Sequence, residues 1–201
     1  RYALSCLARE TPQTLLIFGD GMIGNLAATL APSVLFPTVD VAMVHRTELG
    51  AKWTANYLPS VKNFSVDDDW ERDLTGSVAV LVATHRAGTV ASIDAALRRL
   101  GDRVVAVHPI GGVPAKATSD LLPGVDIAGV RQANTGGPTP PAVTTFTRGA
   151  QRVALTGNRG VTNSQLTAAA TALTNAENSI DRLLTHRRGI DEGTALMNTI
   201  C

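Results

Sequence analysis

A short apolar segment followed by three glycines has the spacing of a phosphate-binding turn. Residues 15–18, LLIF, are long enough for a buried strand and too short for a helix. Gly19, Gly21 and Gly24 follow in the pattern GxGxxG, and small apolar residues at helical spacing continue over 22–31. A strand before the glycines and a helix after them are the context in which this motif binds a dinucleotide.

Each glycine has a separate role in such a turn. The first allows the tight turn from strand to helix, the second lets a pyrophosphate approach the main chain, and the third lets the helix pack closely on the strand. The N–H groups that begin a helix have no partner within it, so we expect the first turn, with Met22 and Ile23, to bind the phosphates. Turns and helix contacts also use glycine for structural reasons alone, and that alternative stays open.

The end of the second predicted strand, at residues 39–45, bears on the choice of dinucleotide. An acid at this end, about 20 residues after the glycines, binds the adenosine ribose in NAD sites. Asp40 lies at the wrong end of the strand, and the correct end carries His45 and Arg46. A cation in place of an acid favours NADP(H) over NAD(H), with both residues in the cofactor site. In the alternative, Arg46 is a surface arginine stacked on adenine, which an NAD site also tolerates.

Composition and charge exclude several classes of protein. The chain has 201 residues, 44% of them hydrophobic and 17% charged, which suffices for one buried core. The net charge is +1 and basic residues are not clustered beyond pairs, so we expect no nucleic-acid partner. No apolar run approaches the roughly 18 residues that span a bilayer, which predicts a cytoplasmic protein without a membrane partner. Cys6 and Cys201 lack metal-ligand spacing, which favours reduced structural thiols.

Strand and helix patterns alternate along the chain. We predict strands at residues 15–18, 39–45, 61–66, 78–83, 103–107 and 152–156. We predict helices at residues 2–9, 22–31, 47–58, 89–100, 163–184 and 190–200. Thr47 is the expected N-cap of the third of these helices. Pro32 is expected to end the second of these helices, and residues 109–149 are expected to be irregular because they are rich in Pro, Gly and Thr. The alternation predicts an α/β fold with a doubly wound, mostly parallel sheet of Rossmann type.

Four segments of the chain resemble the medium-chain dehydrogenase/reductase superfamily, of the zinc alcohol, threonine and sorbitol dehydrogenase type. LLIFGDGMIGNLAATLA is similar to its nucleotide turn, and VAMVHRTELGAKW to its second strand and helix, with His45 where NAD-dependent members carry Asp. VAVLVATHRAGTVASIDAALRRLGDRVVAVHP resembles its next strand, turn, helix and strand, and LLTHRRGIDEGTALMNTI resembles its closing segment. The resemblance implies a Rossmann nucleotide-binding domain over residues 1–182. It implies that residues 183–201 are the segment that returns to the catalytic domain in the family.

The resemblance also implies further residues of the cofactor site. Ala83, Thr84 and His85 correspond to the turn that lines the cofactor in the family. His108, with Ile110, lies at the end of the following strand, where a doubly wound sheet binds its ligand. We therefore expect His85 and His108 to line the nicotinamide pocket rather than to act in catalysis. In the family the late strand, here at 152–156, lies at the sheet edge and pairs across a homodimer, which is the partner we expect.

One large part of the family's structure has no counterpart in this sequence. Members carry a GroES-like catalytic domain before the nucleotide domain, and it holds the zinc ligands or the groups that orient the substrate. The four histidines here do not have the spacing of a catalytic zinc site, so we expect no zinc bound by this chain. The chain is either a piece of a larger reductase or a naturally shortened relative, and the closing segment favours the first.

The function implied is that of an NAD(P)(H)-dependent oxidoreductase, which moves hydride between nicotinamide and a small carbonyl or alcohol substrate. The sequence identifies no catalytic residue. A short-chain reductase is disfavoured because neither Tyr2 nor Tyr57 has a lysine four residues later. Two alternatives stay open. One is a non-catalytic nucleotide-binding or dimerisation module, and the other is an S-adenosylmethionine-dependent methyltransferase, which also has a glycine turn after its first strand.

Overall fold

The part of the chain that the structure describes folds around one β-sheet. The computed structural model describes residues 4, 7–35, 37–84, 89–110, 144–148 and 151–155, with residues 166, 167, 170, 171 and 174. Its strands are β1 (Thr14–Phe18), β2 (Asp40–His45), β3 (Lys62–Ser65), β4 (Val78–Val82), β5 (Val104–Pro109), β6 (Thr144–Arg148) and β7 (Gln151–Leu155). Its α-helices are α2 (Met22–Val34), α3 (Glu48–Tyr57) and α4 (Thr89–Leu100), with short 3-10 helices η1 (Ala8–Glu10), η2 (Trp70–Arg72) and η3 (Gly101–Arg103).

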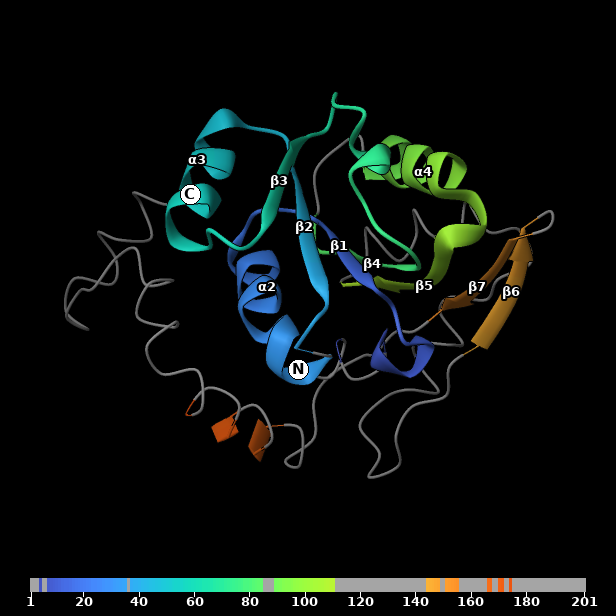
Figure 1. Cartoon of the computed structure of the whole chain (residues 1–201), viewed down its shortest axis with the longest axis horizontal. Coiled ribbons are helices and arrows are strands. Elements are labelled where there is room, and N and C mark those ends of the chain that lie inside the picture. The colour runs from blue at the N-terminus through green and yellow to red at the C-terminus, as the bar shows by residue number, and fades with distance from the viewer. Residues whose placement is uncertain are drawn as a thin grey trace, which may run out of the picture.

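The sheet winds outward in two directions from its centre. Within the described residues it has seven strands in the order β3-β2-β1-β4-β5-β7-β6 (Figure 1). β1 pairs in parallel with β2 and β4, and parallel pairing continues to β3 on one side and to β5 and β7 on the other. β6 runs antiparallel to β7. The predicted α/β fold, a doubly wound and mostly parallel sheet of Rossmann type, is confirmed.

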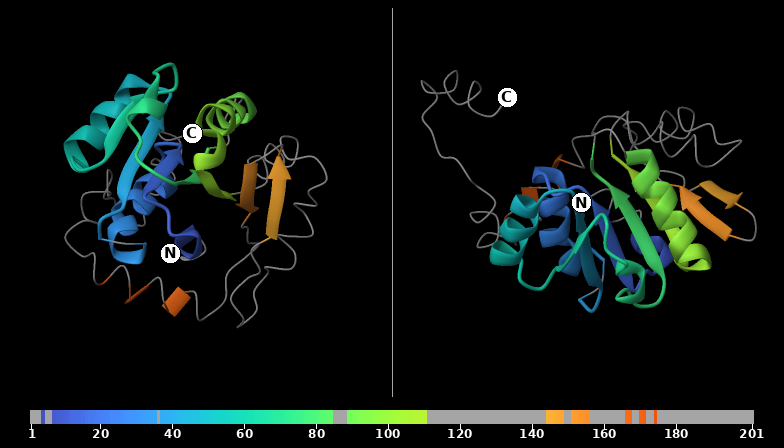
Figure 2. Two further views of the ribbon diagram at one scale, coloured as in Figure 1. Left: turned by 45° about the vertical axis from the view of Figure 1, so that its right-hand side comes forward. Right: turned by 90° about the horizontal axis from the view of Figure 1, so that it is seen from above.

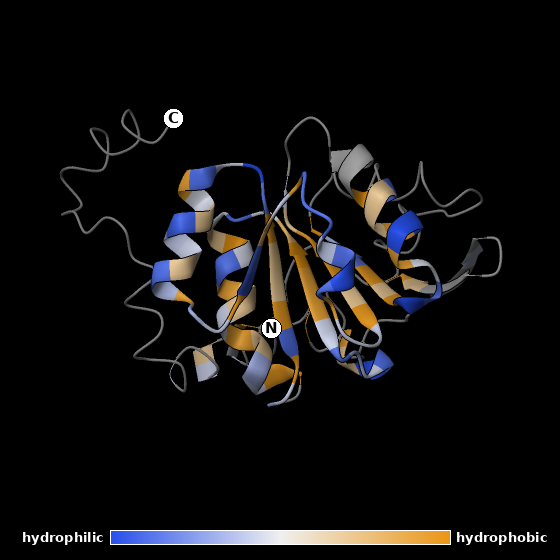
Figure 3. Ribbon diagram, turned by 45° about the horizontal axis from the view of Figure 1, so that its top comes forward, coloured by the Kyte–Doolittle hydropathy of each residue, from blue (hydrophilic) through white to orange (hydrophobic). Residues whose placement is uncertain are grey.

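Helices cover both faces of this sheet. β1 and β4 are buried along their whole length, and their side chains alternate between two apolar clusters. Leu16 and Phe18 lie in the cluster that includes α4, whereas Leu15 and Ile17 lie in the cluster that includes α2. Figure 2 shows α4 on one face, and α2 with α3 on the other. Because the strands are enclosed on both faces (Figure 3), their sequences are continuous apolar runs.

The helices begin and end close to the predicted residues. α2 starts after Gly21, and α3 starts after Thr47, whose side chain accepts a hydrogen bond of 3.2 Å from the N–H of Gly50. That contact confirms Thr47 as the N-cap. α4 spans the predicted residues 89–100 and is followed by Gly101, whose φ of +51° favours glycine.

The expectation that Pro32 ends α2 is wrong. The helix continues for two more residues, to Val34. Proline removes one helical hydrogen bond, which would run from its own nitrogen to the carbonyl of residue 28. The N–H of Leu35 still donates to the carbonyl of Ala31 at 2.8 Å, so the last turn closes in spite of that loss.

Two expectations about the far side of the sheet are also wrong. Residues 144–148 belong to the stretch predicted to be irregular, yet they form β6. The threonines and the phenylalanine of TTFTR favour a strand, and the Pro-rich sequence before them does not prevent it. β7, expected at the sheet edge, lies between β5 and β6. The antiparallel ladder from Thr144 and Leu155 to Arg148 and Gln151 covers the side of β7 that was expected to be exposed.

Several predictions concern the chain ends. At the N-terminal side, Leu4 and Leu7 are helical and buried, and they pack in the cluster that includes α2. Of the helix predicted at 163–184, the described residues 166, 167, 170, 171 and 174 are helical. The helix predicted at 190–200, the segment 183–201 and both cysteines lie outside the described residues. Among the helices that the structure describes, none has the length and apolarity needed to cross a membrane.

Asp40 links β2 to β3 and to the loop before β4, at the amino ends of the parallel strands. Lys62 Nζ lies 2.9 Å from Asp40 Oδ2, and Thr75 Oγ1 donates to the same oxygen at 3.0 Å. The hydrogen bond from Lys62, followed by that from Thr75, holds the pKa of Asp40 below its ordinary value of 3.8. Asp40 therefore has a structural role far from the glycine turn.

This lowered pKa predicts a pH-dependent contribution to stability. The Asp40 contacts stabilise the fold above about pH 4, and their contribution is lost as the pH falls through the lowered folded-state pKa. Because both side chains are about 40% exposed, D40N should lower the free energy of unfolding by no more than about 1 kcal/mol at neutral pH. Urea denaturation near pH 7 and near pH 2 measures both values. If D40N lowered the free energy of unfolding by the same amount at the two pH values, an electrostatic role of Asp40 would be contradicted.

Candidate functional site

The carboxyl ends of β1 and β4 meet at the centre of the sheet, where the two winding directions diverge. Phe18 is the register partner of Val82, and the N–H of Ala83 donates to the carbonyl of Phe18 at 2.8 Å. Ile110 continues the same edge from β5, because its N–H donates to the carbonyl of Val82 at 2.8 Å. Doubly wound sheets bind ligands outside this edge. The structure therefore brings Gly19, Ala83 and Ile110 to one place.

The three glycines of the turn have different surroundings. Gly19 has φ of +113°, and a Cβ there would stand 2.7 Å from the carbonyl oxygen of Ala83. A Cβ on Gly24 would overlap the carbonyl oxygen of Gly19. Gly21 has extended backbone, and no described atom lies within 4 Å of the position that a Cβ would take. The first and third glycines therefore serve packing, whereas the second faces open space, as a phosphate-binding turn requires.

The first turn of α2 is open to solvent at this point. Met22 is 80% exposed and Ile23 is 43% exposed, although both are large and apolar. The N–H groups of a first helical turn point out of the helix, and the helix dipole makes this end favourable for an anion. The N-terminus of α2 beside Gly21 is therefore open and favourable for a negative charge.

The buried amide of Asn25 holds the glycine turn against α3. Its Nδ2 donates to the carbonyls of Asp20 at 2.6 Å and Gly21 at 3.1 Å. Its Oδ1 accepts from Thr54 Oγ1 on α3 at 3.4 Å. Asn25 is 5% exposed and Thr54 is fully buried, so water competes little for these bonds. The conformation of the turn is therefore set by side chains as well as by glycine.

His45 is buried beside the turn. The residue is 2% exposed, and its two ring nitrogens face two different side chains. Nδ1 lies 3.3 Å from Asp20 Oδ2, and Nε2 lies 2.6 Å from Asn63 Oδ1 on β3. The Asp20 carboxylate also packs on the Cα of Gly50, in the first turn of α3, where the helix dipole favours an anion.

This contact corrects the premise that no acid stands at the end of β2. The strand itself has none there, but Asp20 supplies a carboxylate from the neighbouring turn. The reason is the parallel register, in which Phe18 pairs with Val44 and the residues after β1 lie beside the end of β2. Arg46 follows His45 and is exposed. We call Asp20, His45 and Arg46 the β2 corner, and it contains an acid as well as a base.

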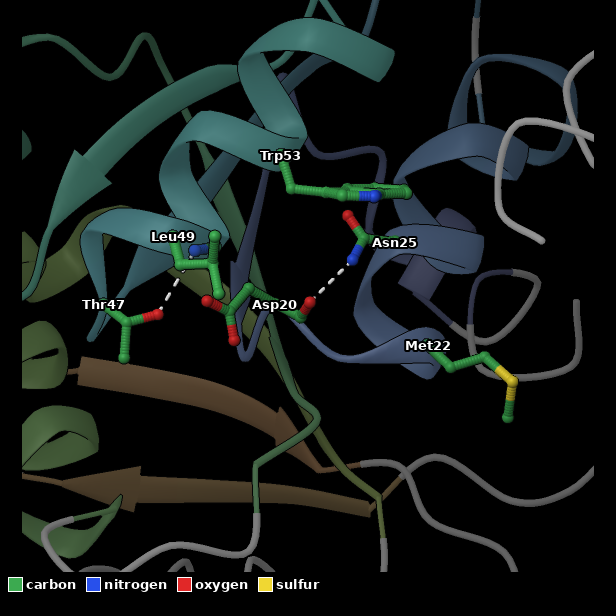
Figure 4. Close-up of a pocket in the computed structure, with 7 residues that line it drawn as sticks. Asp20, Met22, Asn25, Thr47, Leu49 and Trp53 are labelled. Atoms are coloured by element: carbon green, nitrogen blue, oxygen red, sulfur yellow. Dashed lines mark hydrogen bonds between the residues drawn. The ribbon is translucent and has the colours of Figure 1, made fainter. Parts of the chain in front are cut away.

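A pocket of about 380 Å³ opens beside the β2 corner, between the N-termini of α2 and α3 (Figure 4). Its lining includes Asp20, Met22 and Asn25 on one side and Thr47, Leu49 and Trp53 on the other. Most of this lining is apolar, and Asp20 is its charged member. Pockets of this size and character bind small molecules or parts of them.

The remaining predicted residues are placed as follows. Thr84 and Ile110 are half-buried at the carboxyl ends of β4 and β5. His108 is 1% exposed, so its ring is enclosed by protein; its role in lining a nicotinamide pocket stays a prediction. His85 lies outside the described residues. Among the residues that the structure describes, no group of three or more His, Cys, Asp or Glu side chains is arranged to hold a metal ion.

Sequence reasoning missed several residues of this site, among them Asp20, Asn25, Asn63 and Trp53. Asp20 and Asn25 flank the predicted phosphate turn, and a polar residue at a buried helical position, such as Asn25, is a usable signal. Asn63 and Trp53 carry no comparable signal, because each reaches the site only through the pairing of β3 with β2 or the packing of α3. Their part in the site depends on tertiary structure.

Comparisons with known proteins add the following findings. No protein-family model matches the chain, and no curated protein matches it. Among solved structures, a xanthine dehydrogenase from Bacillus halodurans is similar, with 19% sequence identity and a TM-score of 0.39. The match covers 55% of this chain and 33% of that one. The sheet agrees with the parallel α/β fold that the resemblance to the medium-chain superfamily implies. A proposal for the function therefore rests on this chain's own residues.

The different surroundings of the glycines predict different effects of alanine. G24A should lower the free energy of unfolding by about 1–3 kcal/mol, because its methyl group meets the carbonyl of Gly19. G21A is the matched control, with the same added methyl group in open space, and should cost less than about 1 kcal/mol. Thermal denaturation compares the two variants. Equal losses would show that the close approach of α2 to the turn is not required for stability.

Proposed function

We propose that this chain binds NADP(H) and serves an oxidoreductase reaction. The observation that carries the proposal is the turn at residues 19–24, where Gly21 faces open space at the N-terminus of α2 and at the switch point of the sheet. Main chain without a Cβ lets a pyrophosphate come close, and the helix N-terminus stabilises its negative charge. These features together support a dinucleotide more strongly than the glycine spacing alone.

The proposed reaction is the reduction of a small carbonyl compound or the oxidation of the corresponding alcohol. When bound, the nicotinamide supplies or accepts hydride at C4. The proposed part of this chain is to hold the phosphates at the turn and to orient the nicotinamide end over Ala83, Thr84 and Ile110, at the ends of β4 and β5. No proton donor is assigned among the described residues.

The preference for NADP(H) over NAD(H) rests on Arg46. An exposed guanidinium beside the end of β2 is suited to a 2′-phosphate, because its planar donors pair with phosphate oxygens. Asp20 acts in the opposite direction, since a carboxylate repels a phosphate and accepts hydrogen bonds from a ribose hydroxyl. The preference therefore depends on how far the neighbours of Asp20 balance its charge.

A non-catalytic nucleotide-binding or dimerisation module remains the second candidate. The same turn would bind the nucleotide, and the fold by itself does not require catalysis. If the chain forms a homodimer, we propose that it does so through β3 or β6, the edge strands of the described sheet, rather than through β7.

Binding of the nucleotide is expected to depend on two residues in different ways. G21A should weaken the binding of both NADPH and NADH by about tenfold, because the added methyl group occupies the space proposed for the pyrophosphate. R46A should weaken the binding of NADPH by about tenfold and leave the affinity for NADH nearly unchanged, since only NADPH has a 2′-phosphate. Isothermal titration calorimetry of the full chain measures the six dissociation constants, for the two nucleotides with the wild type and each variant.

Lys52 provides the matched control for Arg46. K52A removes a positive charge from the same segment, but Lys52 pairs with Glu48 at 2.7 Å and lies on the exposed face of α3. It should leave both affinities unchanged. Absence of binding of either nucleotide to the wild-type chain would refute the proposal, and binding without turnover of any aldehyde, ketone or alcohol would select the non-catalytic module.

A further inference from the structure

The amide of Asn63 determines where one proton of His45 lies. Asn63 Nδ2 donates to the carbonyl oxygen of Val61 at 2.9 Å, and a carbonyl oxygen can only accept. The amide oxygen Oδ1 is therefore the atom that faces His45, at 2.6 Å from Nε2. Because Oδ1 also can only accept, Nε2 must carry a proton.

The other ring nitrogen of His45 faces an acceptor as well. Nδ1 lies 3.3 Å from Asp20 Oδ2. Neutral imidazole carries a single proton, and with that proton on Nε2 the lone pair of Nδ1 would point at a carboxylate. The His45 side chain is only 1% exposed, so water does little to relieve the repulsion. One additional proton between Nδ1 and Oδ2 converts the repulsion into a hydrogen-bonded pair.

We infer that His45 is an imidazolium whose second proton lies on Nδ1, and that it is a positioning residue and counter-charge for Asp20 at the β2 corner. Imidazole is intrinsically a stronger base than a carboxylate, which places the proton on the ring. A buried cation needs an anion and a second acceptor to offset its desolvation, and Asp20 Oδ2 and Asn63 Oδ1 provide both.

The groups near His45 come from the turn after β1, from β3 and the residues after it, and from residues 46–48. Just after the end of β3, Asp68 accepts a hydrogen bond of 2.6 Å from the N–H of Ser65, the register partner of His45. Asp20 approaches from the turn after β1, and Asn63, which is neutral, approaches from β3. Arg46 is the next residue in the chain and is exposed. On α3, the side chain of Glu48 is 81% exposed and pairs with Lys52. Among these described groups, Asp20 is therefore the ionisable partner in contact with the ring.

This proton state has a consequence for nucleotide selection, and that step rests on the proposed function. When His45 is charged, its positive charge offsets the negative charge of Asp20. The remaining positive charge of Arg46 then attracts an anionic ligand group to the β2 corner. The side chain of Asp20 is 30% exposed, so its charge reaches a ligand there. Loss of the His45 proton removes the balancing charge, and the 2′-phosphate of NADPH is then repelled. NADPH, but not NADH, should bind less tightly as the pH rises.

Nitrogen NMR of the histidine rings tests the proton state without any nucleotide. In the full chain with 15N-labelled histidine, both ring nitrogens of His45 should have the chemical shifts of an imidazolium near neutral pH. The signals of His45 are identified by their loss in H45Q. In D20N, the new amide can donate to Nδ1, so His45 should become neutral with its proton on Nε2.

D40N is the matched control, because it makes the same substitution at the opposite end of β2, away from His45. It should leave the imidazolium signals unchanged. A neutral His45 in the wild-type chain near neutral pH would overturn the inference, as would an imidazolium that persists in D20N. If D20N does not fold, the wild-type spectrum still decides the outcome.

The ratio of the dissociation constants of NADPH and NADH tests the effect on selection. Between about pH 7 and about pH 9 a phosphate monoester is already a dianion, so its own titration does not interfere. In the wild-type chain the ratio should be on the order of tenfold larger at the higher pH, and it should stay constant in D20N. D40N should follow the wild-type profile.

The two experiments separate the possible failures. An imidazolium signal with no binding of either nucleotide would support the Asp20–His45 pair and refute the proposed function. An imidazolium signal with a flat wild-type ratio would refute the role of the pair in selection. A rising ratio with a neutral His45 throughout would assign the pH dependence to another group and overturn the inference.

Discussion

The close approach of three main-chain segments around Gly19 is the constraint on which the rest of the site depends. The turn after β1 lies against the carbonyl of Ala83 after β4, and α2 lies against the turn at Gly24. Side chains at these positions would separate β1, β4 and α2 by the thickness of a methyl group or more. Because the strands hold their carboxyl ends in register, this contact places the N-terminus of α2 directly at the switch point of the sheet.

A buried polar network complements this apolar packing. Asn25 links the turn to α3 through Thr54, and His45 links the turn to β3 through Asp20 and Asn63. Hydrogen bonds of this kind add little net stability when complete, but a broken one leaves a buried polar atom without a partner. The network therefore specifies one arrangement of the turn relative to α3 and β3. It also holds the Asp20 carboxylate beside the His45 ring at the β2 corner.

The charges of the β2 corner are best understood as a group. An acid alone there would favour a ribose hydroxyl, and a base alone would favour a 2′-phosphate. Here Arg46 is exposed, Asp20 is partly exposed and His45 is buried against Asp20. A doubly wound sheet serves many functions, so the proposed function rests on these side chains and on the open space at Gly21 rather than on the fold.

The amino-acid sequence determined the parts of this protein that depend on neighbours along the chain. Continuous apolar runs predicted β1 and β4, and the glycine spacing predicted the turn between β1 and α2. Thr47 predicted the start of α3. All three depend on local properties, namely the apolar sequence of a buried strand, the backbone geometry of glycine and helix capping. Only the tertiary structure decided that β7 is internal, since that depends on pairing with β6. The same holds for the acid at the β2 corner. Asp20 and Asn63 lie 25 and 18 residues from His45, and parallel pairing of β1, β2 and β3 is what brings their side chains together.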